Sequence, residues 1–535
     1  MLEKSTTMRR TPRSCFAVVI ALGSLAACGA PDELPFDAEP VATATEAFTA
    51  TANQKASGDS SRGATAVSLV TTMLGKGTAV AGYASKPAGA PTAAWSFSPD
   101  AGVSWSAHRS DEAGEFQWPA APVNDGPFAY YGDAPTLVAL EAFPGVVVAV
   151  VSAYGEHASA VDAIALVSTD GGAHFKNPTL ITTESYADRP GAAPVLEYVT
   201  AGPVVGTSGG AGEGVWTAYR DHQAWFMRKL AYDPASQRMK IAGEDTRIPI
   251  SMIKHSGDAL TEPAGPSSIL AIINTNGEEV VQVAWSSYDN RLDTCPSAAP
   301  RSTPWRVEWN VAAAQWSSTV GLVGGWLKGK SLFDDNYWPR CLGAGGRFFK
   351  NTIQPRLAAD PVSHTVWAAT NSSDGKSGTS ISIYRLAEHP FDATTLGDWI
   401  LRSTKQENGD PLLGVHDQWG PTLAVLRSVG DALPTIAVTW HDTRDDPASP
   451  GLTTTLWGGF SHSEAVADMF APIVFSVGRV TPLSANAQPV PWALSDFWGR
   501  YDGIAASPAT GDFLVAWSDS RAGGKTEIWT SRITP

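Results

Sequence analysis

The sequence predicts an all-β fold assembled from small repeated sheets, and three observations carry this prediction. A short apolar strand segment recurs along the chain at steps of 65 to 82 residues. The 535 residues include 50 Gly and 38 Pro, which suit many tight turns. Stretches with the 3.6-residue apolar period of amphipathic helices are scarce, which excludes a helical solenoid.

Seven copies of the apolar segment define the repeat, each being the second strand of a unit. Their equivalent positions are Val80, Val151, Trp216, Trp285, Trp367, Trp440 and Trp517. One such step accommodates four strands of about six residues with their turns. A sheet of that size cannot bury both of its faces, whereas several packed in a ring can. We therefore expect a β-propeller of four-stranded antiparallel blades, with seven blades favoured and six as the alternative.

First strands precede the second strands at a regular distance. They include Pro135–Val138, Pro194–Leu196, Ile269–Ile272, Pro355–Ala358, Pro421–Ala424 and Gly503–Ala505. The last unit ends with Thr526–Arg532, which we expect to be its third strand. Residues 45–63, just before the first unit, are expected to supply the missing fourth strand and close the ring.

Two turns carry a sharper signature, S-x-D-x-G-x-x-W/F, in phase with the strand repeat. Its positions are Ser98, Asp100, Gly102 and Trp105 in one copy, and Ser168, Asp170, Gly172 and Phe175 in the other. The motif resembles the Asp-box of sialidase-like propellers. A turn explains the residue types, since Asp accepts bonds from turn amides and Gly permits positive φ. In that family the boxes are structural, so the resemblance implies no catalytic role for them.

Antiparallel strands place any ligand site on one edge of the blades. First strands begin and second strands end at the same rim, whereas the Asp-box turns lie at the opposite one. Loops of the first rim carry acids, arginines and tryptophans, which suit binding or cleavage of a glycan. The candidate catalytic residues are Tyr501, Asp502 and Asp417. The candidate substrate-binding residues are Arg189, Arg356, Arg500, Trp419, Trp498 and His416.

Two functions fit these residues. The sialidase resemblance implies three arginines on a substrate carboxylate, a tyrosine activated by an acid, and an acid/base aspartate. However, the F/Y-R-I-P motif that sialidases carry before their first Asp-box is missing; Arg247–Pro249 contains R-I-P but follows both boxes. The first hypothesis is thus a glycan-directed propeller, with a sialidase-like exo-glycosidase as its enzymatic form. The alternative is a non-catalytic propeller that binds protein or polysaccharide.

The N-terminal segment predicts export and lipid anchoring. A basic start is followed by an apolar run, Cys15–Ala27, too short to span a bilayer. Leu25–Cys28 resembles a bacterial lipoprotein signal, in which Cys28 is lipidated. We therefore expect a signal peptide over 1–27, a flexible tether over 28–62 and the propeller over 63–535. The anchor would hold the chain on the cell envelope, at the outer membrane or cell surface.

Cysteines and charge limit the remaining expectations. Cys295 and Cys341 form an even pair in an oxidising compartment, so we expect a disulfide between them. The net charge of −15 argues against a nucleic-acid partner. No metal-ligand spacing is present and no cofactor is expected, although loop carboxylates leave a structural calcium open. We expect a monomer whose membrane contact is the lipid anchor alone.

Overall fold

The computed structural model describes the chain in segments. They are residues 48–57, 64–85, 92–109, 130–154, 161–181, 199–206, 214–221, 224–250, 253–254, 260–274, 276–288, 303–316, 320–321, 355–373, 379–386, 399–402, 405–406, 418–427, 434–442, 453–461, 474–481, 488–489, 502–519 and 527–535. All regular elements within these segments are strands. None of the described residues belongs to a helix long and apolar enough to cross a membrane.

Most strands belong to small antiparallel sheets whose strands follow one another in sequence. The first sheet contains β3 (Ala64–Thr72), β4 (Thr78–Ser85), β5 (Thr92–Ser98) and β6 (Ser106–Arg109). The second contains β7 (Tyr130–Ala139), β8 (Val147–Tyr154), β9 (Val161–Ser168) and β10 (Lys176–Leu180). Another four-stranded sheet contains β22 (Arg356–Ala359), β23 (Val366–Ser373), β24 (Thr379–Leu386) and β25 (Trp399–Arg402).

An eleven-stranded sheet contains two such groups. One comprises β11 (Val199–Val205), β12 (Gly214–Asp221), β13 (Ala224–Asp233), β14 (Arg238–Ile241) and β15 (Thr246–Ile248). The other comprises β16 (Ile253–Lys254), β17 (Leu260–Ile273), β18 (Glu279–Tyr288), β19 (Thr303–Asn310), β20 (Gln315–Trp316) and β21 (Val320–Gly321). The first strands β11 and β17 join them through a short parallel pairing at Val204 and Val205.

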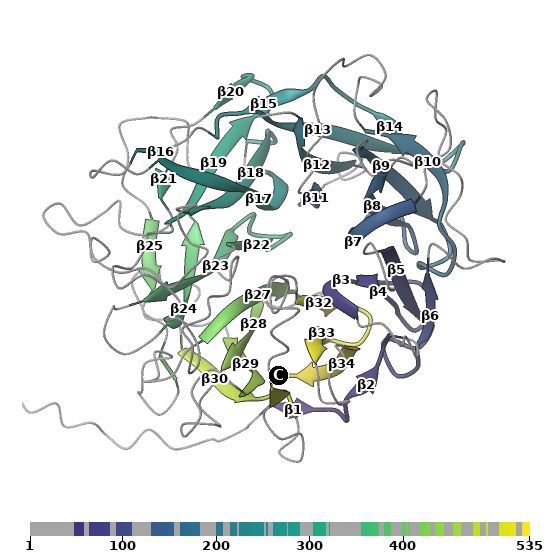
Figure 1. Cartoon of the computed structure of the whole chain (residues 1–535), viewed down its shortest axis with the longest axis vertical. Coiled ribbons are helices and arrows are strands. Elements are labelled where there is room, and N and C mark those ends of the chain that lie inside the picture. The colour runs from purple at the N-terminus through teal and green to yellow at the C-terminus, as the bar shows by residue number, and fades with distance from the viewer. Residues whose placement is uncertain are drawn as a thin grey trace, which may run out of the picture. The chain divides into compact units, whose positions relative to one another are not determined.

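Two further sheets complete the folded unit. One contains β26 (Lys405–Gln406), β27 (Gln418–Leu426), β28 (Thr435–Asp442), β29 (Thr453–Ser461), β30 (Val474–Arg479) and β31 (Gln488–Pro489). The other contains β32 (Gly503–Ser507), β33 (Asp512–Asp519) and β34 (Glu527–Thr534), together with β1 (Thr49–Ala50) and β2 (Gln54–Lys55). In Figure 1 the first strands β3, β7, β11, β22, β27 and β32 surround the centre of the unit.

Hydrophobic cores lie between consecutive sheets and run around the whole ring. For example, Val80 and Trp95 of the first sheet pack with Val151 and Ile164 of the second. The next cores join β8–β9 to β12–β13, β12–β13 to β17–β19, β17–β18 to β22–β23, β23–β24 to β27–β30, and β27–β29 to β32–β34. A final core returns from Leu514 and Ala516 to Leu69 and Ala81. The described chain is therefore a closed β-propeller.

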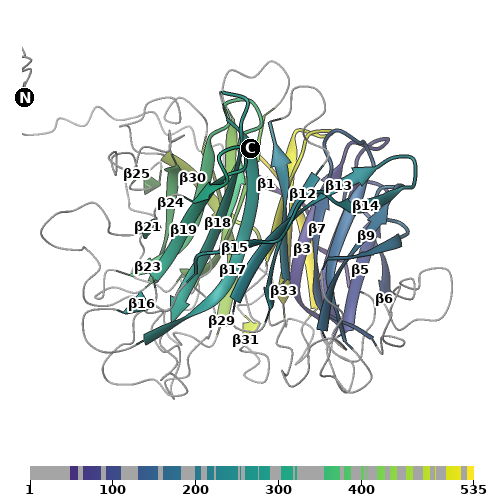
Figure 2. The same ribbon diagram turned by 90° about the horizontal axis from the view of Figure 1, so that it is seen from above.

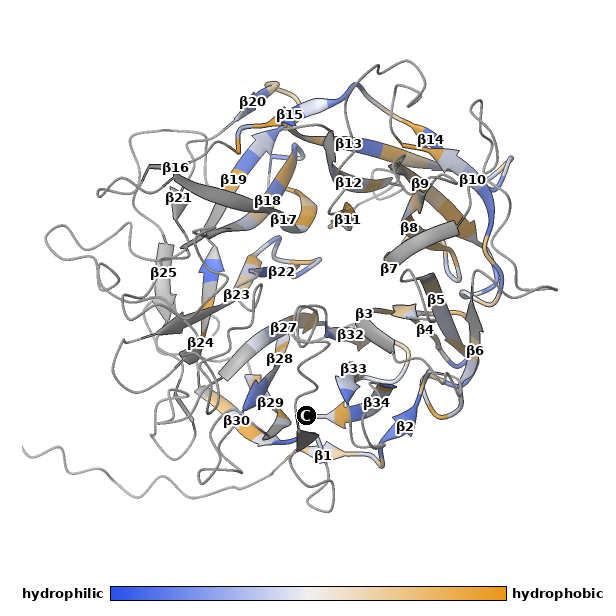
Figure 3. Cartoon of the chain, viewed as in Figure 1, coloured by the Kyte–Doolittle hydropathy of each residue, from blue (hydrophilic) through white to orange (hydrophobic). Residues whose placement is uncertain are grey.

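Burial explains why these segments are strands. The second strands consist mainly of buried Val, Ala and Trp, because both faces of each sheet contact a neighbouring sheet. Figure 3 shows the contrast between the hydrophobic strand β9 and the hydrophilic edge strand β2. The predicted second strands all lie within β4, β8, β12, β18, β23, β28 and β33, as expected.

The N-terminal strands complete the last sheet, which confirms the predicted closure. Thr49 pairs with Thr534, and Gln54 pairs with Thr530 on β34. Phe48 is buried and packs edge-to-face on Phe460, with ring centroids 5.1 Å apart. Residues 48–57, at the end of the segment expected to be a tether, therefore belong to the folded unit.

The strand order defines two rims, which we use below. The entry rim is the edge where first strands begin and second strands end. The turn rim is the opposite edge, which carries the turns after the first and third strands, including Ser98–Trp105 and Ser168–Phe175. Figure 2, turned by 90° from Figure 1, shows the strands running between these two edges.

Candidate functional site

The sequence predicts a ligand site at the entry rim, but many of the predicted residues lie outside the described residues. These are Asp417, His416, Arg189, Arg500, Tyr501 and Trp498, as well as Cys28 and the pair Cys295 and Cys341. Trp419 is described only as backbone within β27, paired with His441. Arg356 and Asp502 are the two predicted site residues whose side chains are described.

Arg356 lies on the innermost strand of its sheet. Its Nη1 donates to the carbonyl oxygen of Ser267 on β17, at 3.1 Å. Ser267 in turn donates through Oγ to the carbonyl oxygen of Pro355, at 2.8 Å. These bonds connect two neighbouring first strands and hold the guanidinium group of Arg356 against β17. Since its side chain is only partly buried, it can offer a positive charge to a ligand at the entry rim.

Asp502 lies just before β32 and is buried between two sheets. Its Oδ2 is 2.5 Å from Nε2 of His441 on β28, and the two side chains are 1% and 2% exposed. Its Oδ1 accepts a bond from the Ser518 backbone amide of β33, at 3.3 Å. Both oxygens are thus used within the fold. The arrangement suits positioning of the preceding loop better than direct contact with a substrate.

The side chains of two further aspartates at this rim also point into the fold. Asp442 accepts a bond from the indole Nε1 of Trp440 at 3.0 Å, and Asp519 accepts one from Trp517 at 3.1 Å. Residues two apart on a strand point to the same side, which brings each carboxylate to its indole. All four side chains are buried. The repeated W-x-D pattern therefore forms a buried hydrogen bond at the end of each of these two second strands.

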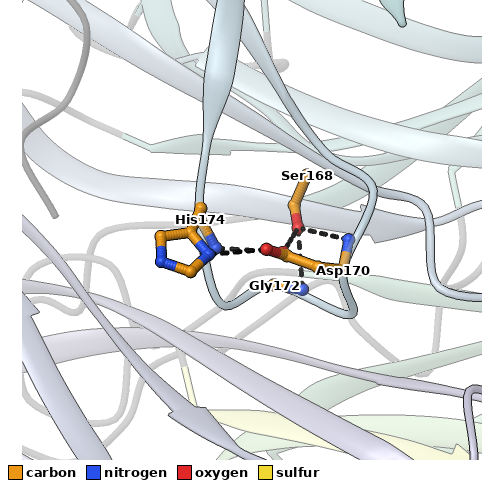
Figure 4. A network of polar contacts seen from close by, with 4 residues as sticks. All are labelled: Ser168, Asp170, Gly172 and His174. Atoms are coloured by element: carbon orange, nitrogen blue, oxygen red, sulfur yellow. Dashed lines mark hydrogen bonds and ion pairs between the residues drawn. The ribbon is translucent and has the colours of Figure 1, made fainter. Parts of the chain in front are cut away.

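The two motif turns lie on the turn rim and share one hydrogen-bond pattern, shown for the second turn in Figure 4. Ser168 Oγ donates to Asp170 Oδ1 at 2.7 Å and accepts from the Gly172 amide at 2.8 Å. Asp170 Oδ1 also accepts from the amide of His174, at 3.0 Å. Ser98, Asp100 and Gly102 repeat these contacts in the first turn. The serine and aspartate of each motif thus hold its turn by hydrogen bonds.

Each motif turn also packs against the preceding sheet. Phe175 is buried and lies edge-to-face against Trp95, with centroids 5.8 Å apart. A Cβ placed on Gly172 would lie 1.9 Å from Val80 Cγ2, and one on Gly102 would lie 2.6 Å from Leu514 Cδ1. Only glycine fits this approach. The motif thus connects neighbouring blades as well as closing a turn.

Hydrogen bonding sets the charge of the motif aspartates. Burial acts to raise the pKa of Asp100, but bonds from Ser104 and Ser98 outweigh it and hold that pKa below its ordinary value. Burial likewise opposes the lowering of the pKa of Asp170, which results from bonds with Ser168 and His174. Both carboxylates are therefore held in the ionised form that the turn amides require.

No cluster of three His, Cys, Asp or Glu side chains that could hold a metal ion occurs within the described segments. Three described aspartates of the entry rim are bound within the fold, Asp502 to His441, Asp442 to the Trp440 indole and Asp519 to the Trp517 indole.

Comparisons with known proteins identify no family: no family model and no curated protein matches the chain. Among solved structures, an α-L-arabinanase of Penicillium chrysogenum complexed with arabinobiose is 13% identical, covers 90% of this chain and 98% of its own, and has a TM-score of 0.40. A GH93 α-L-arabinofuranosidase of Fusarium graminearum is 12% identical, with coverages of 91% and 98% and a TM-score of 0.40.

A sialidase of Trypanosoma rangeli is 11% identical and covers 74% of this chain and 53% of its own, with a TM-score of 0.35. Scores of this size do not establish a shared fold. The description of the chain as a β-propeller therefore rests on its own sheets and on the cores between them.

Proposed function

We propose that this chain is a glycan-directed β-propeller that binds its ligand at the entry rim. The observation that carries the proposal is the partly exposed Arg356, fixed on an innermost strand by its bond to Ser267. Arginine is suited to carboxylate or hydroxyl groups of a sugar. The Asp-box resemblance of the two motif turns adds support, because that resemblance points to glycan-directed propellers.

The proposal includes a count of seven blades. The sheets and strand groups built on the second strands β4, β8, β12, β18, β23, β28 and β33 would each be one blade. The succession of cores from sheet to sheet supports this count, with β1 and β2 supplying the outer strand of the last blade.

Binding without hydrolysis is the function the geometry favours, because the Asp502 carboxylate is occupied by His441 and Ser518. A sialidase-like exo-glycosidase is the second candidate. It is favoured by the chain order Arg500–Tyr501–Asp502. Because Asp502 is buried, it would anchor the chain directly after the tyrosine. In that case Tyr501 would be the nucleophile and Asp417 the acid, with Arg189, Arg356 and Arg500 on a substrate carboxylate. Trp419, Trp498 and His416 would line the sugar.

The cellular location and the partner of the protein are part of the same proposal. Leu25–Cys28 supports export and lipidation of Cys28, which would hold a monomeric propeller on the cell envelope. A Cys295–Cys341 bridge would restrain a long loop of the entry rim. A glycan or cell-surface polysaccharide is the proposed partner, whereas the net charge of −15 disfavours nucleic acid.

The test is a screen of the purified full chain against a glycan array and against fluorogenic glycosides that include sialosides. Arg356→Ala should lower affinity for any glycan found by at least about tenfold, as expected for loss of a charged hydrogen bond of about 1.5–3 kcal/mol. Arg238→Ala, which removes an exposed arginine from β14, is the matched control and should bind normally. Hydrolysis abolished by Tyr501→Phe would select the enzymatic form. Absence of both binding and hydrolysis would refute the proposal.

A further inference from the structure

The exposed large hydrophobic side chains of the described residues gather on the turn rim. Met73, Leu74 and Val103 are 59%, 38% and 56% exposed, and all three belong to turns of the first sheet. We call these three residues the apolar rim patch. Val362, 57% exposed, lies in a turn of the same rim, whereas Ile241 lies on the outer strand β14.

The patch is continuous with turns of the two neighbouring sheets. A Cβ placed on Gly145, between β7 and β8, would lie 3.2 Å from Leu74 Cδ2. One placed on Gly77 would lie 3.3 Å from the Cβ of Ala509, which lies between β32 and β33. The apolar side chains therefore project from packed turns held by three sheets, and not from an isolated loop.

The N-terminal chain enters the folded unit at this same rim. Thr49 pairs with Thr534, at the end of the third strand β34, and third strands end at the turn rim. Phe48, which is buried and directly precedes Thr49, therefore lies at the turn-rim end of the last sheet. That sheet is the one whose Ala509 adjoins the patch.

The length of the connecting chain limits how the unit can face a membrane. Nineteen residues lie between Cys28 and Phe48. A flexible chain of that length has a root-mean-square span of about 25 Å, close to the length of an eight-residue strand at about 3.3 Å per residue. Lipid on Cys28 would thus favour the turn rim as the side nearest to the bilayer, because the chain would have to extend by an additional blade height to bring the entry rim there.

We propose that the apolar rim patch docks on the lipid bilayer, so that the entry rim faces away from the membrane toward its glycan. This rests on the lipid anchor at Cys28 proposed above. The bilayer is the favoured occupant because Phe48 at this rim is the described residue nearest in sequence to the anchor, and because the patch offers three exposed apolar side chains, with Lys76, Asp100 and Glu141 as the charged residues of the surrounding turns. Side chains of this kind insert about 5–10 Å into the interfacial region.

Depth-dependent quenching tests the docking. The full lipidated chain, carrying a fluorescent amino acid at position 103, is reconstituted into phosphatidylethanolamine–phosphatidylglycerol vesicles whose acyl chains are brominated. The probe at 103 should be quenched at least about twofold more than a probe at 241, since only the former would enter the region of the acyl chains. Position 241 is the matched control because Ile241 is 46% exposed but outside the patch. The double substitution Met73→Glu, Leu74→Glu should abolish the difference.

Three outcomes would overturn the docking. Equal quenching at 103 and 241, in protein whose mass shows lipid on Cys28, refutes it while leaving the anchor in place. A peptide mass without lipid on Cys28 refutes the anchor and the docking with it. If the emission of the probe at 103 depends on the protein-to-lipid ratio but not on bromination, a second copy of the chain covers the patch in place of the bilayer. Glycan binding is measured separately on the array, so its failure is distinguishable from all three.

Discussion

Gly172→Ala should destabilise the protein strongly, because this glycine lies where two blades meet. Its φ is +103°, a conformation that costs an alanine about 1–2 kcal/mol. The added Cβ would also lie 1.9 Å from Cγ2 of Val80, which is fully buried. Overpacking of this kind costs about 1–3 kcal/mol. The two effects together predict a loss of about 2–5 kcal/mol in the free energy of unfolding.

Denaturant unfolding followed by tryptophan fluorescence measures this loss, and Gly277→Ala is the matched control. Gly277 has φ +79° but no atom within 4 Å of its Cβ position, so its substitution reports the backbone cost alone. In a Val80→Ala background, the additional effect of Gly172→Ala should fall toward that of Gly277→Ala, because the contact at 1.9 Å is removed and only the Val80 Cβ, at 3.1 Å, remains. The reasoning is refuted if Gly172→Ala costs no more than Gly277→Ala, or if Val80→Ala leaves its cost unchanged.

Three further predictions concern other contacts. Asp502→Ala should cost about 1–3 kcal/mol of unfolding free energy by removing the carboxylate bonded to buried His441, and a double-mutant cycle with His441→Ala should give a coupling above about 0.5 kcal/mol; a smaller coupling contradicts the pairing. The lowered pKa values of Asp100 and Asp170 stabilise the fold fully above the ordinary value of 3.8, and this stability is lost as pH falls through the folded values. Unfolding measured from pH 6 to 2 should therefore show less acid sensitivity in Asp100→Asn than in the wild type, by less than about 1 kcal/mol for so exposed a group; an unchanged profile would contradict this. Phe48→Ala should lower the unfolding free energy by about 3 kcal/mol, whereas a neutral effect in denaturant would show that the N-terminal strands do not hold the last blade.

Much of the fold was predictable because the second strands are buried on both faces. Their runs of Val, Ala and Trp recur at the interval of one repeat unit and can therefore be recognised in the sequence. The predicted first strand of the third unit, Pro194–Leu196, lies outside the described residues, and the described strand β11 covers Val199–Val205. Gly202 and Pro203 look like a turn in the sequence but lie within β11. A Cβ on Gly202 would lie 1.6 Å from the Ile269 carbonyl oxygen, so the glycine permits close approach of two first strands.

The site was less predictable because residue type does not reveal the direction of a side chain. Asp502 was predicted to be catalytic from its place beside Tyr501, but its carboxylate is buried against His441, which the sequence did not single out. Asp442 and Asp519 each accept a bond from the indole two residues before them, which the sequence did not single out. Alternation along a strand was the available signal for those indole contacts.

Hydrogen exchange with and without a bound oligosaccharide tests the central claim most directly. If the ligand binds at the entry rim, amides near Arg356 and at the start of β32 should exchange more slowly in the complex. The turns at 72–77 and 101–105 should be unaffected. Protection confined to the turn rim, or to the outer strands, would contradict the proposed place of the glycan.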